Sequence, residues 1–387
     1  MEYAEILHRC FRCGYCKLPS DYSNLNCPSY LQYRFETYSP GGMMWLLRGW
    51  LDKKFQTSPR LSEIFFSCVA CGNCVEHCAF QTFKEDILNA FIAGREELVN
   101  EGAVPPTARD YFRSIQLYGN PYKLPEAERA NWAEGLDLEP YENQEYLFYI
   151  GCVGSYDERG QKMARATAKL LKNLGVSCGI LGAEERCDGN EVNTMGEKGL
   201  FGQLAGQNIE QFQSLNIKKI VTLSPHGFHA MKNEYPKHGG DFEVYHYSQI
   251  LAQHIGTLKL DTPNKELRVT YHDPCYLGRH NGEYQAPRTL LQSIPGIEFV
   301  EMDRNMNDAL CCGGGGGNFF TDMIGVGVDS PVRIRVREAL ETRAEILVVA
   351  CPSCAKMFED AVKAESLDDK LRVMDLSEII QARQTSE

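Results

Sequence analysis

The sequence predicts a mixed fold, in which a mainly α-helical, ferredoxin-type region with two metal clusters precedes two copies of one α/β unit. Three observations support this prediction. The first 80 residues carry two dense cysteine runs, a strand–cysteine pattern occurs twice in the second half, and proline-rich sequence lies between. We expect a helical domain at 1–100, a linker at 101–145, one unit at 146–262 and its repeat at 263–387.

The composition is that of a chain that folds around hydrophobic cores. Its 387 residues are 43% hydrophobic and 24% charged, and the net charge of −12 argues against nucleic acid as the main partner. No apolar run approaches the roughly 20 residues that span a bilayer, and residues 1–5 lack the core of a signal peptide. We therefore expect a cytoplasmic protein with no transmembrane segment of its own. In a reducing compartment, its sixteen cysteines indicate metal binding or redox chemistry.

The N-terminal cysteines have the spacing of bacterial ferredoxins that hold two [4Fe–4S] clusters. One run is Cys10-x2-Cys13-x2-Cys16 followed by Cys27, and the other is Cys68-x2-Cys71-x2-Cys74-x3-Cys78. In this pattern each run gives three ligands to one cluster and its last cysteine to the other. The expected ligands are Cys10, Cys13, Cys16 and Cys78 for the first cluster, and Cys68, Cys71, Cys74 and Cys27 for the second.

Two departures from the ferredoxin pattern remove no ligand. Residues 17–26 form an insertion before Cys27, and Ala79 follows Cys78 where proline is usual. Zinc is the alternative metal, but structural zinc sites use two pairs of ligands rather than two runs of three thiolates.

Two helices are expected around these runs. The apolar stretch 43–51 predicts a core helix packed between the clusters, with a docking face for a membrane or partner as the alternative. Apolar residues in 84–100 recur near the 3.6-residue period, and Gly102 follows as a stop signal. The linker contains five prolines and predicts a surface connector with short helices and no chemistry.

The second half repeats itself with matching order and period. The apolar strand before Cys152 corresponds to the strand before Cys275, and Cys187 follows the first cysteine as Cys311 follows the second. Strands alternate with helices, which predicts parallel sheets with the cysteines at the carboxyl ends of strands. The expected helices include residues 159–174, 196–214, 332–343 and 355–365.

Five cysteines of the second copy predict an iron–sulfur site. Two are adjacent, two are three residues apart, and glycine or proline flanks each group. The glycine run 313–317 lets the backbone approach a bulky group and offers N–H groups to its sulfurs. Buried or disulfide-bonded cysteines are the alternative. The five are Cys275, Cys311, Cys312, Cys351 and Cys354.

The first copy has lost part of this group. It keeps Cys152 and Cys187, but Asp188, Ser224 and Gly227 stand where the second copy has Cys312, Cys351 and Cys354. Glycine has no side chain to bind a metal. We therefore expect a vestigial site that supports the fold, with two thiolates and an aspartate that hold something as the alternative.

The C-x35-CC-x38-C-x2-C spacing of the second copy resembles the cysteine-rich CCG domain of the B-type and D-type subunits of heterodisulfide reductase. Two ferredoxin-type clusters followed by two CCG units resemble the D-type subunit, or a fusion of the C-type and B-type subunits, over nearly the whole chain. The iron–sulfur subunit of anaerobic glycerol-3-phosphate dehydrogenase is similar. The resemblance implies a noncubane [4Fe–4S] cluster on the five cysteines. It also implies that a disulfide mechanism with two noncubane clusters is in doubt, because the first copy lacks three ligands.

The leading functional hypothesis is an electron-transfer subunit of a larger anaerobic oxidoreductase, with two cubane clusters and one noncubane cluster. No flavin or nicotinamide fingerprint is present, so we expect other subunits, among them a flavoprotein. The alternatives are an enzyme that reduces a disulfide at the noncubane cluster, and a binding module with structural or oxygen-sensing clusters. The sequence identifies no catalytic residue, so whether the chain is an enzyme by itself stays open.

Some side chains near the second group have open roles. His272, Arg279 and His280 are expected beside the cluster or on the surface, with proton donation or anion contact as the alternative. The alternating Arg333, Arg335 and Arg337 predict a solvated basic face, with docking of an acidic partner as the alternative.

Overall fold

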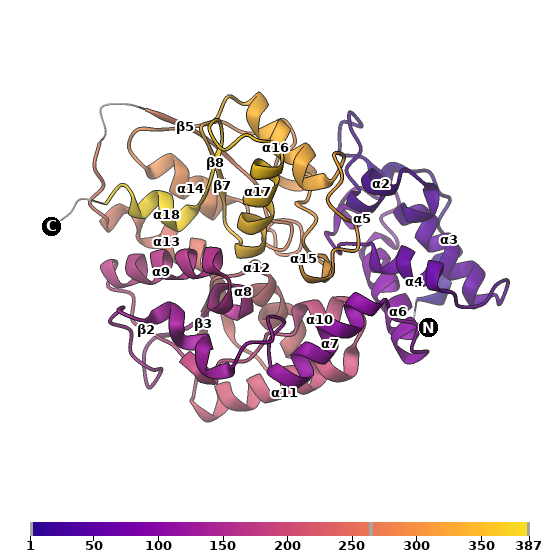
Figure 1. Cartoon of the computed structure of the whole chain (residues 1–387), viewed down its shortest axis with the longest axis horizontal. Coiled ribbons are helices and arrows are strands. Elements are labelled where there is room, and N and C mark those ends of the chain that lie inside the picture. The colour runs from indigo at the N-terminus through magenta and orange to yellow at the C-terminus, as the bar shows by residue number, and fades with distance from the viewer. Residues whose placement is uncertain (1–2, 263–265, 385–387) are drawn as a thin grey trace.

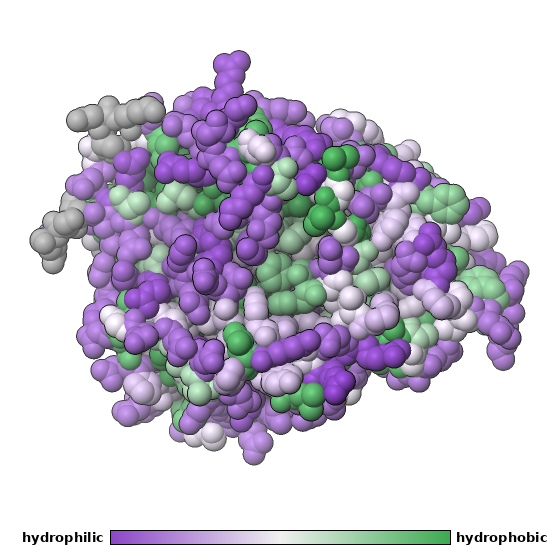
Figure 2. Space-filling view, viewed as in Figure 1, coloured by the Kyte–Doolittle hydropathy of each residue, from purple (hydrophilic) through white to green (hydrophobic). Residues whose placement is uncertain are grey.

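The computed structural model describes residues 3–262 and 266–384. A helical region forms the right-hand end of Figure 1, and two α/β units lie one above the other at the left. The expected start of the second unit, at 263–265, lies outside the described residues. Figure 2 shows hydrophilic side chains over most of this face, interrupted by apolar residues toward the middle. No described helix is both long and apolar enough to cross a bilayer.

The helical region consists of short helices around one core that includes Leu47, Phe65 and Phe91. The helix expected at 84–100 is present as a 3-10 turn that continues into α6. The elements are α1 (Ala4–Leu7), η1 (Tyr15–Lys17), α2 (Pro28–Tyr33), η2 (Glu36–Tyr38), α3 (Pro40–Leu51), α4 (Pro59–Phe66), α5 (Asn73–Glu76), η3 (Lys84–Asp86) and α6 (Ile87–Asn100).

Local sequence explains where α3 begins. The Ser39 side chain accepts a hydrogen bond from the Gly42 N–H, and Pro40 occupies the first turn, where its missing N–H costs nothing. Helix α3 buries Met43, Met44 and Leu47. The prediction of a core helix in this stretch is therefore confirmed.

The segment between the helical region and the first unit forms α7 (Pro106–Tyr118) and the 3-10 helix η4 (Glu126–Ala133). Its contacts are more extensive than those of a surface connector. Tyr111 is buried and its ring lies 5.2 Å from that of Phe320 in the second unit. Arg129 is also buried and reaches into the first unit.

The first unit is a four-stranded parallel sheet in the order β2-β1-β3-β4. The central pair aligns Leu147 with Ile220, and all of β1 is buried, as expected for a strand covered on both faces. The strands are β1 (Tyr146–Tyr149), β2 (Cys178–Gly179), β3 (Lys219–Thr222) and β4 (Glu243–His246). The helical elements are α8 (Gly151–Tyr156), α9 (Glu158–Asn173), η5 (Gly182–Glu184), α10 (Asn190–Thr194), α11 (Lys198–Ser214), α12 (Pro225–His229), η6 (Ala230–Glu234), η7 (Tyr235–His238), α13 (Tyr247–His254) and η8 (Ile255–Thr257).

The second unit has the equivalent order, β6-β5-β7-β8, with Val269 aligned to Ile346 in its central pair. The internal duplication is therefore visible in the topology. The strands are β5 (Leu267–Tyr271), β6 (Ile297–Phe299), β7 (Ile346–Val349) and β8 (Arg372–Asp375). The helical elements are α14 (Gln285–Ser293), η9 (Met306–Asp308), α15 (Asn318–Thr321), α16 (Pro331–Glu341), α17 (Pro352–Ala364) and α18 (Leu376–Gln381).

Buried polar contacts join the two units. Arg159 of α9 donates to both carboxylate oxygens of Glu378 in α18, at 2.7 and 2.6 Å. The Tyr247 hydroxyl donates to Asp375 at 2.8 Å. These contacts hold the two sheets in a fixed relation, so that groups at their facing edges form one site.

Candidate iron–sulfur sites

The structure brings the first set of predicted ligands together around one cavity under α3. Cys13 is exposed, whereas Cys10 and Cys16 are half-buried and Cys78 is buried. The loop that carries Cys13 contains Gly14 at φ 88°, a left-handed conformation that suits glycine. Pro40 and Met44 of α3 form another wall. The four cysteines that line this cavity are Cys10, Cys13, Cys16 and Cys78.

The second predicted set lines a neighbouring cavity. Cys16 lines both cavities, so the two sites share a wall. Met43, adjacent in sequence to Met44, lies on this side of α3. The sequence assigns the last cysteine of each run to the cluster of the other run, and each of these cysteines lines the cavity of that other run. Which cysteines bind each cluster stays a prediction. The cysteines of this second set are Cys27, Cys68, Cys71 and Cys74.

The five cysteines of the second α/β unit are all buried at the carboxyl edge of its sheet. Cys275 follows β5, and Cys351 precedes α17 directly after β7. The central strands β5 and β7 are neighbours, so their loops meet at one edge, where ligand sites of parallel sheets lie. The Cys275 and Cys311 sulfurs are 3.7 Å apart.

A second sulfur pair completes this group. The Cys312 and Cys354 sulfurs are 3.3 Å apart, and both lie with a ring nitrogen of His272 inside a radius typical of a metal site, within 4.8 Å of one another. Although burial opposes it, hydrogen bonds with Cys354 and His226 lower the pKa of the Cys351 thiol to about 5. Because thiolates are the metal-binding form and soft sulfur donors suit iron–sulfur clusters, the donor set fits such a cluster.

The glycine run after Cys312 packs against the helical region. A Cβ atom on Gly315 would lie 2.6 Å from the carbonyl oxygen of Val69, and one on Gly316 would lie 2.6 Å from that of Cys68. The Gly313 and Gly314 N–H groups point at the sulfurs of Cys311 and Cys312, at 3.3 and 3.5 Å. Donation to sulfur is therefore present at the cysteines, and the close approach that the glycines permit is to the backbone of the helical region, while approach to a cluster stays a prediction.

The cysteine groups of the helical region and the second unit meet directly. The Cys71 and Cys311 thiols lie close to each other, and the interaction with Cys311 raises the pKa of Cys71. Nearby, Arg279 and His280 contact the backbone carbonyls of Cys71 and Ala70, at 2.8 and 2.9 Å. The expectation that these side chains lie near the cluster residues is met.

One expectation about arginines is wrong. Arg335 is fully buried rather than solvated. Its Nη1 pairs with Glu338 at 2.8 Å, and its Nε donates to Nδ1 of His272 at 3.4 Å. Arg333 and Arg337 pair with Glu365. Residues two apart in a helix face different directions, so Arg335 lies on the stripe of the buried Val332, Val336 and Ala339, away from Arg333 and Arg337.

The equivalent site of the first unit has different chemistry. Cys152 and Cys187 hydrogen-bond to each other, and the Arg129 guanidinium donates to the Cys152 sulfur at 3.4 Å. A Cβ atom on Gly227 would lie 3.5 Å from the Asp188 carboxylate, which therefore occupies this edge. A small pocket with a volume of about 40 Å³ opens here and is also lined by Ser353 of the second unit.

Sequence reasoning missed two residues of the first unit, His226 and Glu191, that reach the cysteine group of the second unit. His226 hydrogen-bonds to Cys351 and lies 2.5 Å from the Glu191 carboxylate. The other Glu191 oxygen accepts from the Gly317 N–H. The available signal was the repeat itself, because Ser224-Pro225-His226 aligns with Cys351-Pro352-Ser353.

Comparisons with known proteins agree with these sites. A 4Fe-4S dicluster domain matches residues 6–82, and the cysteine-rich domain CCG matches 146–232 and 269–359. The chain is 31% identical over 402 residues to a Methanosarcina barkeri protein, the D-type subunit of dihydromethanophenazine:CoB–CoM heterodisulfide reductase. That match covers 97% of this chain and 93% of the relative.

Other relatives are longer. The EtfAB:quinone oxidoreductase of Syntrophomonas wolfei is 36% identical over 334 residues, and FadF of Bacillus subtilis, named as an iron–sulfur-binding oxidoreductase, is 37% identical over 333. Each match covers 82% of this chain and 46% of the relative, so the chain spans about half the length of these relatives. The chain belongs to the family of CCG-domain iron–sulfur oxidoreductases that includes the D-type subunit of heterodisulfide reductase, and it binds [4Fe–4S] clusters.

Proposed function

We propose that the chain is the electron-transfer subunit of an anaerobic oxidoreductase complex, with two cubane [4Fe–4S] clusters and one noncubane cluster. The clusters supply one-electron transfer when bound. The cysteines of the helical region would hold the cubane clusters in the two cavities that they line. The five cysteines at the edge of the second sheet would hold the noncubane cluster.

The observation that carries this proposal is the continuity of the three cysteine groups. Cys16 lines both cavities of the helical region, and Cys71 of the second set contacts Cys311 of the third. Each cysteine group is therefore separated from the next by no more than one shared or touching side chain. The third group is wholly buried and the second is buried except for half-buried Cys68, while exposed Cys13 gives the first group an outlet at the surface.

The proposed partners are other subunits of a redox complex, one of them a flavoprotein. The described residues form no dinucleotide-binding glycine motif, since the run 313–317 packs on the backbone of the helical region instead. A two-electron donor would therefore be oxidised on another subunit. The name of the Syntrophomonas relative, which couples EtfAB to quinone, supports a protein donor of this kind.

The first test is iron and acid-labile sulfide content of anaerobically prepared protein, with low-temperature EPR of oxidised and reduced samples. We expect about twelve irons for three [4Fe–4S] clusters. Cys312→Ser should lose about four of them together with one oxidised-state signal. Cys178→Ser is the matched control, because Cys178 lies in β2 away from the three groups and should keep all signals. About sixteen irons in the wild-type chain would contradict the proposal that the first unit holds no cluster.

The pocket between the two α/β units favours a second candidate function. It reaches Cys152 and Cys187 on one side and Ser353, next to the predicted ligand Cys354, on the other. This lining, and not the volume of the pocket, is what favours a disulfide reduced at the noncubane cluster. A viologen-driven assay of the isolated chain with small disulfides separates the two functions, since the relay predicts no turnover and the reductase predicts sustained turnover.

A further inference from the structure

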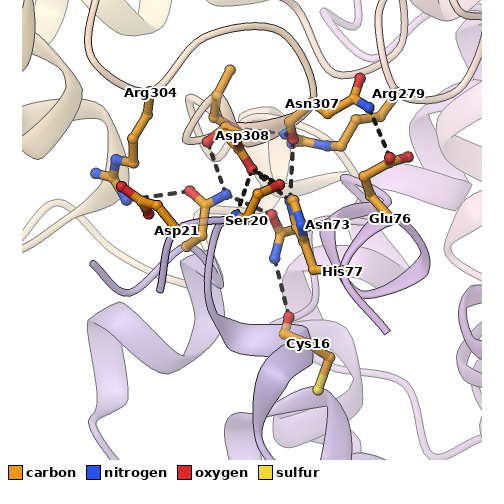
Figure 3. Close-up of polar contacts among 12 residues, drawn as sticks. Cys16, Ser20, Asp21, Asn73, Glu76, His77, Arg279, Arg304, Asn307 and Asp308 are labelled. Atoms are coloured by element: carbon orange, nitrogen blue, oxygen red, sulfur yellow. Dashed lines mark hydrogen bonds and ion pairs between the residues drawn. The ribbon is translucent and has the colours of Figure 1, made fainter. Parts of the chain in front are cut away.

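Arg279 lies where the helical region meets the second α/β unit (Figure 3). Its Nε donates to the carbonyl oxygen of Cys71 at 2.8 Å. Its Nη1 donates to the carbonyl oxygens of Ala309 at 2.6 Å and Asn307 at 3.2 Å. One guanidinium group therefore ties the backbone of the second cubane run to the backbone that leads into Cys311.

The positive charge of Arg279 faces sulfur rather than carboxylate. Its hydrogen bonds within the described residues go to backbone carbonyls, which leave the charge uncompensated. Although burial opposes the charge, the anionic forms of Cys71, Cys275 and Cys311 raise the pKa of Arg279. These cysteines come from both groups that meet at this interface. The guanidinium is thus the cation shared by two anionic sites.

We propose that Arg279 is a positioning residue for electron transfer between the second cubane site and the noncubane site, where its charge raises both reduction potentials. This inference rests on the proposed function. The step itself moves one electron from one site to the other, and no atom or proton is transferred.

Electrostatics predicts the sign of the shift in reduction potential. A nearby cation stabilises whichever site gains negative charge, and the effect is large where water is excluded. Cluster potentials depend on net charge and on hydrogen bonds around the sulfurs. Arginine also suits the second part of the role, because its planar fork can hold carbonyls on both sides of an interface, whereas lysine offers a point charge.

Arg95 provides a matched comparison. It is buried and donates to the carbonyl oxygens of Phe65 and Cys68, next to the same cubane run. Its remaining contact is the Thr194 carbonyl at 2.7 Å. Burial lowers the pKa of Arg95, and the groups that oppose this are Cys68, Tyr276 and Glu191, so the cysteine among them belongs to the cubane run. Arg95 should therefore act on the cubane site alone.

The experiment is an EPR-monitored redox titration of the full chain with all clusters present, for wild type, Arg279→Gln, Arg279→Lys and Arg95→Gln. Arg279→Gln should lower both potentials by about a tenfold change in the reduction equilibrium, which is about 59 mV for one electron. Arg279→Lys should shift both by less than half of that. Arg95→Gln should shift only the cubane signal.

Unchanged potentials in Arg279→Gln at wild-type iron content would overturn the inference. So would a shift of both signals in Arg95→Gln. If Arg279→Gln loses iron, the test rests on Arg279→Lys. A shift of the reduction equilibrium below half of the tenfold change in this variant supports the role of charge, and a larger shift overturns it. Absence of the three clusters from wild type would instead overturn the proposed function, so the two failures are distinguishable.

Discussion

Asp375 is a buried carboxylate at the contact between the two α/β units. Its carboxylate accepts hydrogen bonds from the Tyr247 hydroxyl of the other unit and from the Ser377 N–H at the start of α18. Burial, and then the charge of Glu378, raise the pKa of Asp375 to about 7. The folded chain therefore keeps a proton there that an unfolded chain, with an ordinary aspartate, releases near pH 4.

We predict that Asp375→Asn removes a pH dependence of stability. Between about pH 4 and 7 the folded state binds more protons than the unfolded state, so wild-type stability falls as the pH rises through this window and stays lower above it. Each pKa unit corresponds to about 1.4 kcal/mol. Asparagine keeps an acceptor for the Ser377 N–H without a charge, so the variant should melt higher than wild type at pH 8 and equally at pH 4.

Anaerobic thermal melts across this range provide the measurement. Asp369→Asn is the control, because Asp369 is exposed in the same unit. Parallel curves for wild type and Asp375→Asn would contradict the prediction.

For single residues, the sequence predicted which cysteines lie together better than it predicted the burial and contacts of charged side chains. Cysteine spacing is a local property, and the predicted cysteines do gather in three groups. The contact of His226 with Cys351 depends on packing between segments far apart in the chain. The 3.6-residue period of the helix places Arg335 on the same stripe as the buried Val332, Val336 and Ala339, and Arg333 and Arg337 on another face. The interpretation of the three arginines as one basic face did not apply this period.

At the scale of single elements, the glycine run between β6 and α16 determines how closely two parts of the chain approach. The Gly315 backbone lies against the Val69 carbonyl and the Tyr276 ring, with no room for a methyl group. Both neighbours are parts of the cluster sites. The run is therefore a spacer whose lack of side chains sets the distance between sites.

We predict that Gly315→Ala destabilises the protein by about 1–3 kcal/mol, the usual cost of overpacking. The added methyl group would push the run away from Val69, so contact between Cys71 and Cys311 should loosen as well. Urea unfolding measures the first effect, and spin coupling in the EPR spectrum of the reduced protein measures the second.

The control for this change is Gly206→Ala in α11, where a Cβ atom would meet nothing within 4 Å. This variant should be neutral or more stable, since alanine is the better helix former. Equal stability of Gly315→Ala and wild type would contradict the role of the glycine run.

Element boundaries followed the sequence where a local signal exists. The expected helix at 355–365 begins at Pro352, because proline in the first turn starts a helix directly after Cys351. Helix α8 was not expected, since its six residues carry no periodic pattern. The linker was predicted as a surface connector, yet Tyr111 and Arg129 are buried, which only the neighbouring parts decide.

For the whole molecule, a polar network fixes the helical region to the second unit (Figure 3). Asp308 accepts from the Ser20 N–H at 2.7 Å and from its hydroxyl at 2.9 Å. Arg304 donates to the Leu25 carbonyl at 2.8 Å. The inserted loop at 17–26, which in sequence is only a departure from the ferredoxin spacing, is thus one of the segments that contact the second unit.

We predict that Asp308→Ala loosens this docking without changing either sheet. Loss of two hydrogen bonds from Ser20 and of the contact with His77 at 3.4 Å should cost about 1–2 kcal/mol, which is a factor of about 5–30 in the open population. Native-state hydrogen exchange should accelerate by that factor at the amides of 20–26. Asp303→Ala, an exposed neighbour, is the control, and unchanged exchange in Asp308→Ala would contradict the prediction.

The duplication and the order of the parts were predictable, because they rest on repeated patterns in the sequence. The way in which the helical region and the two α/β units face each other could not be predicted. Nothing in the spacing of Cys71 and Cys311 indicates that they touch, since 239 intervening residues separate them. That contact arises from Arg279, the glycine run and the docking loop acting together.

The lining of the first cavity has a consequence for how the protein is made. Its thiols come from Cys10, Cys13 and Cys16 at one end of the region and from Cys78 at the other. During synthesis, the first three emerge from the ribosome many seconds of chain growth before the cavity can close. Maturation of this region is therefore necessarily late, and a chain stalled before residue 78 would present an incomplete, oxygen-accessible thiol set to the assembly machinery.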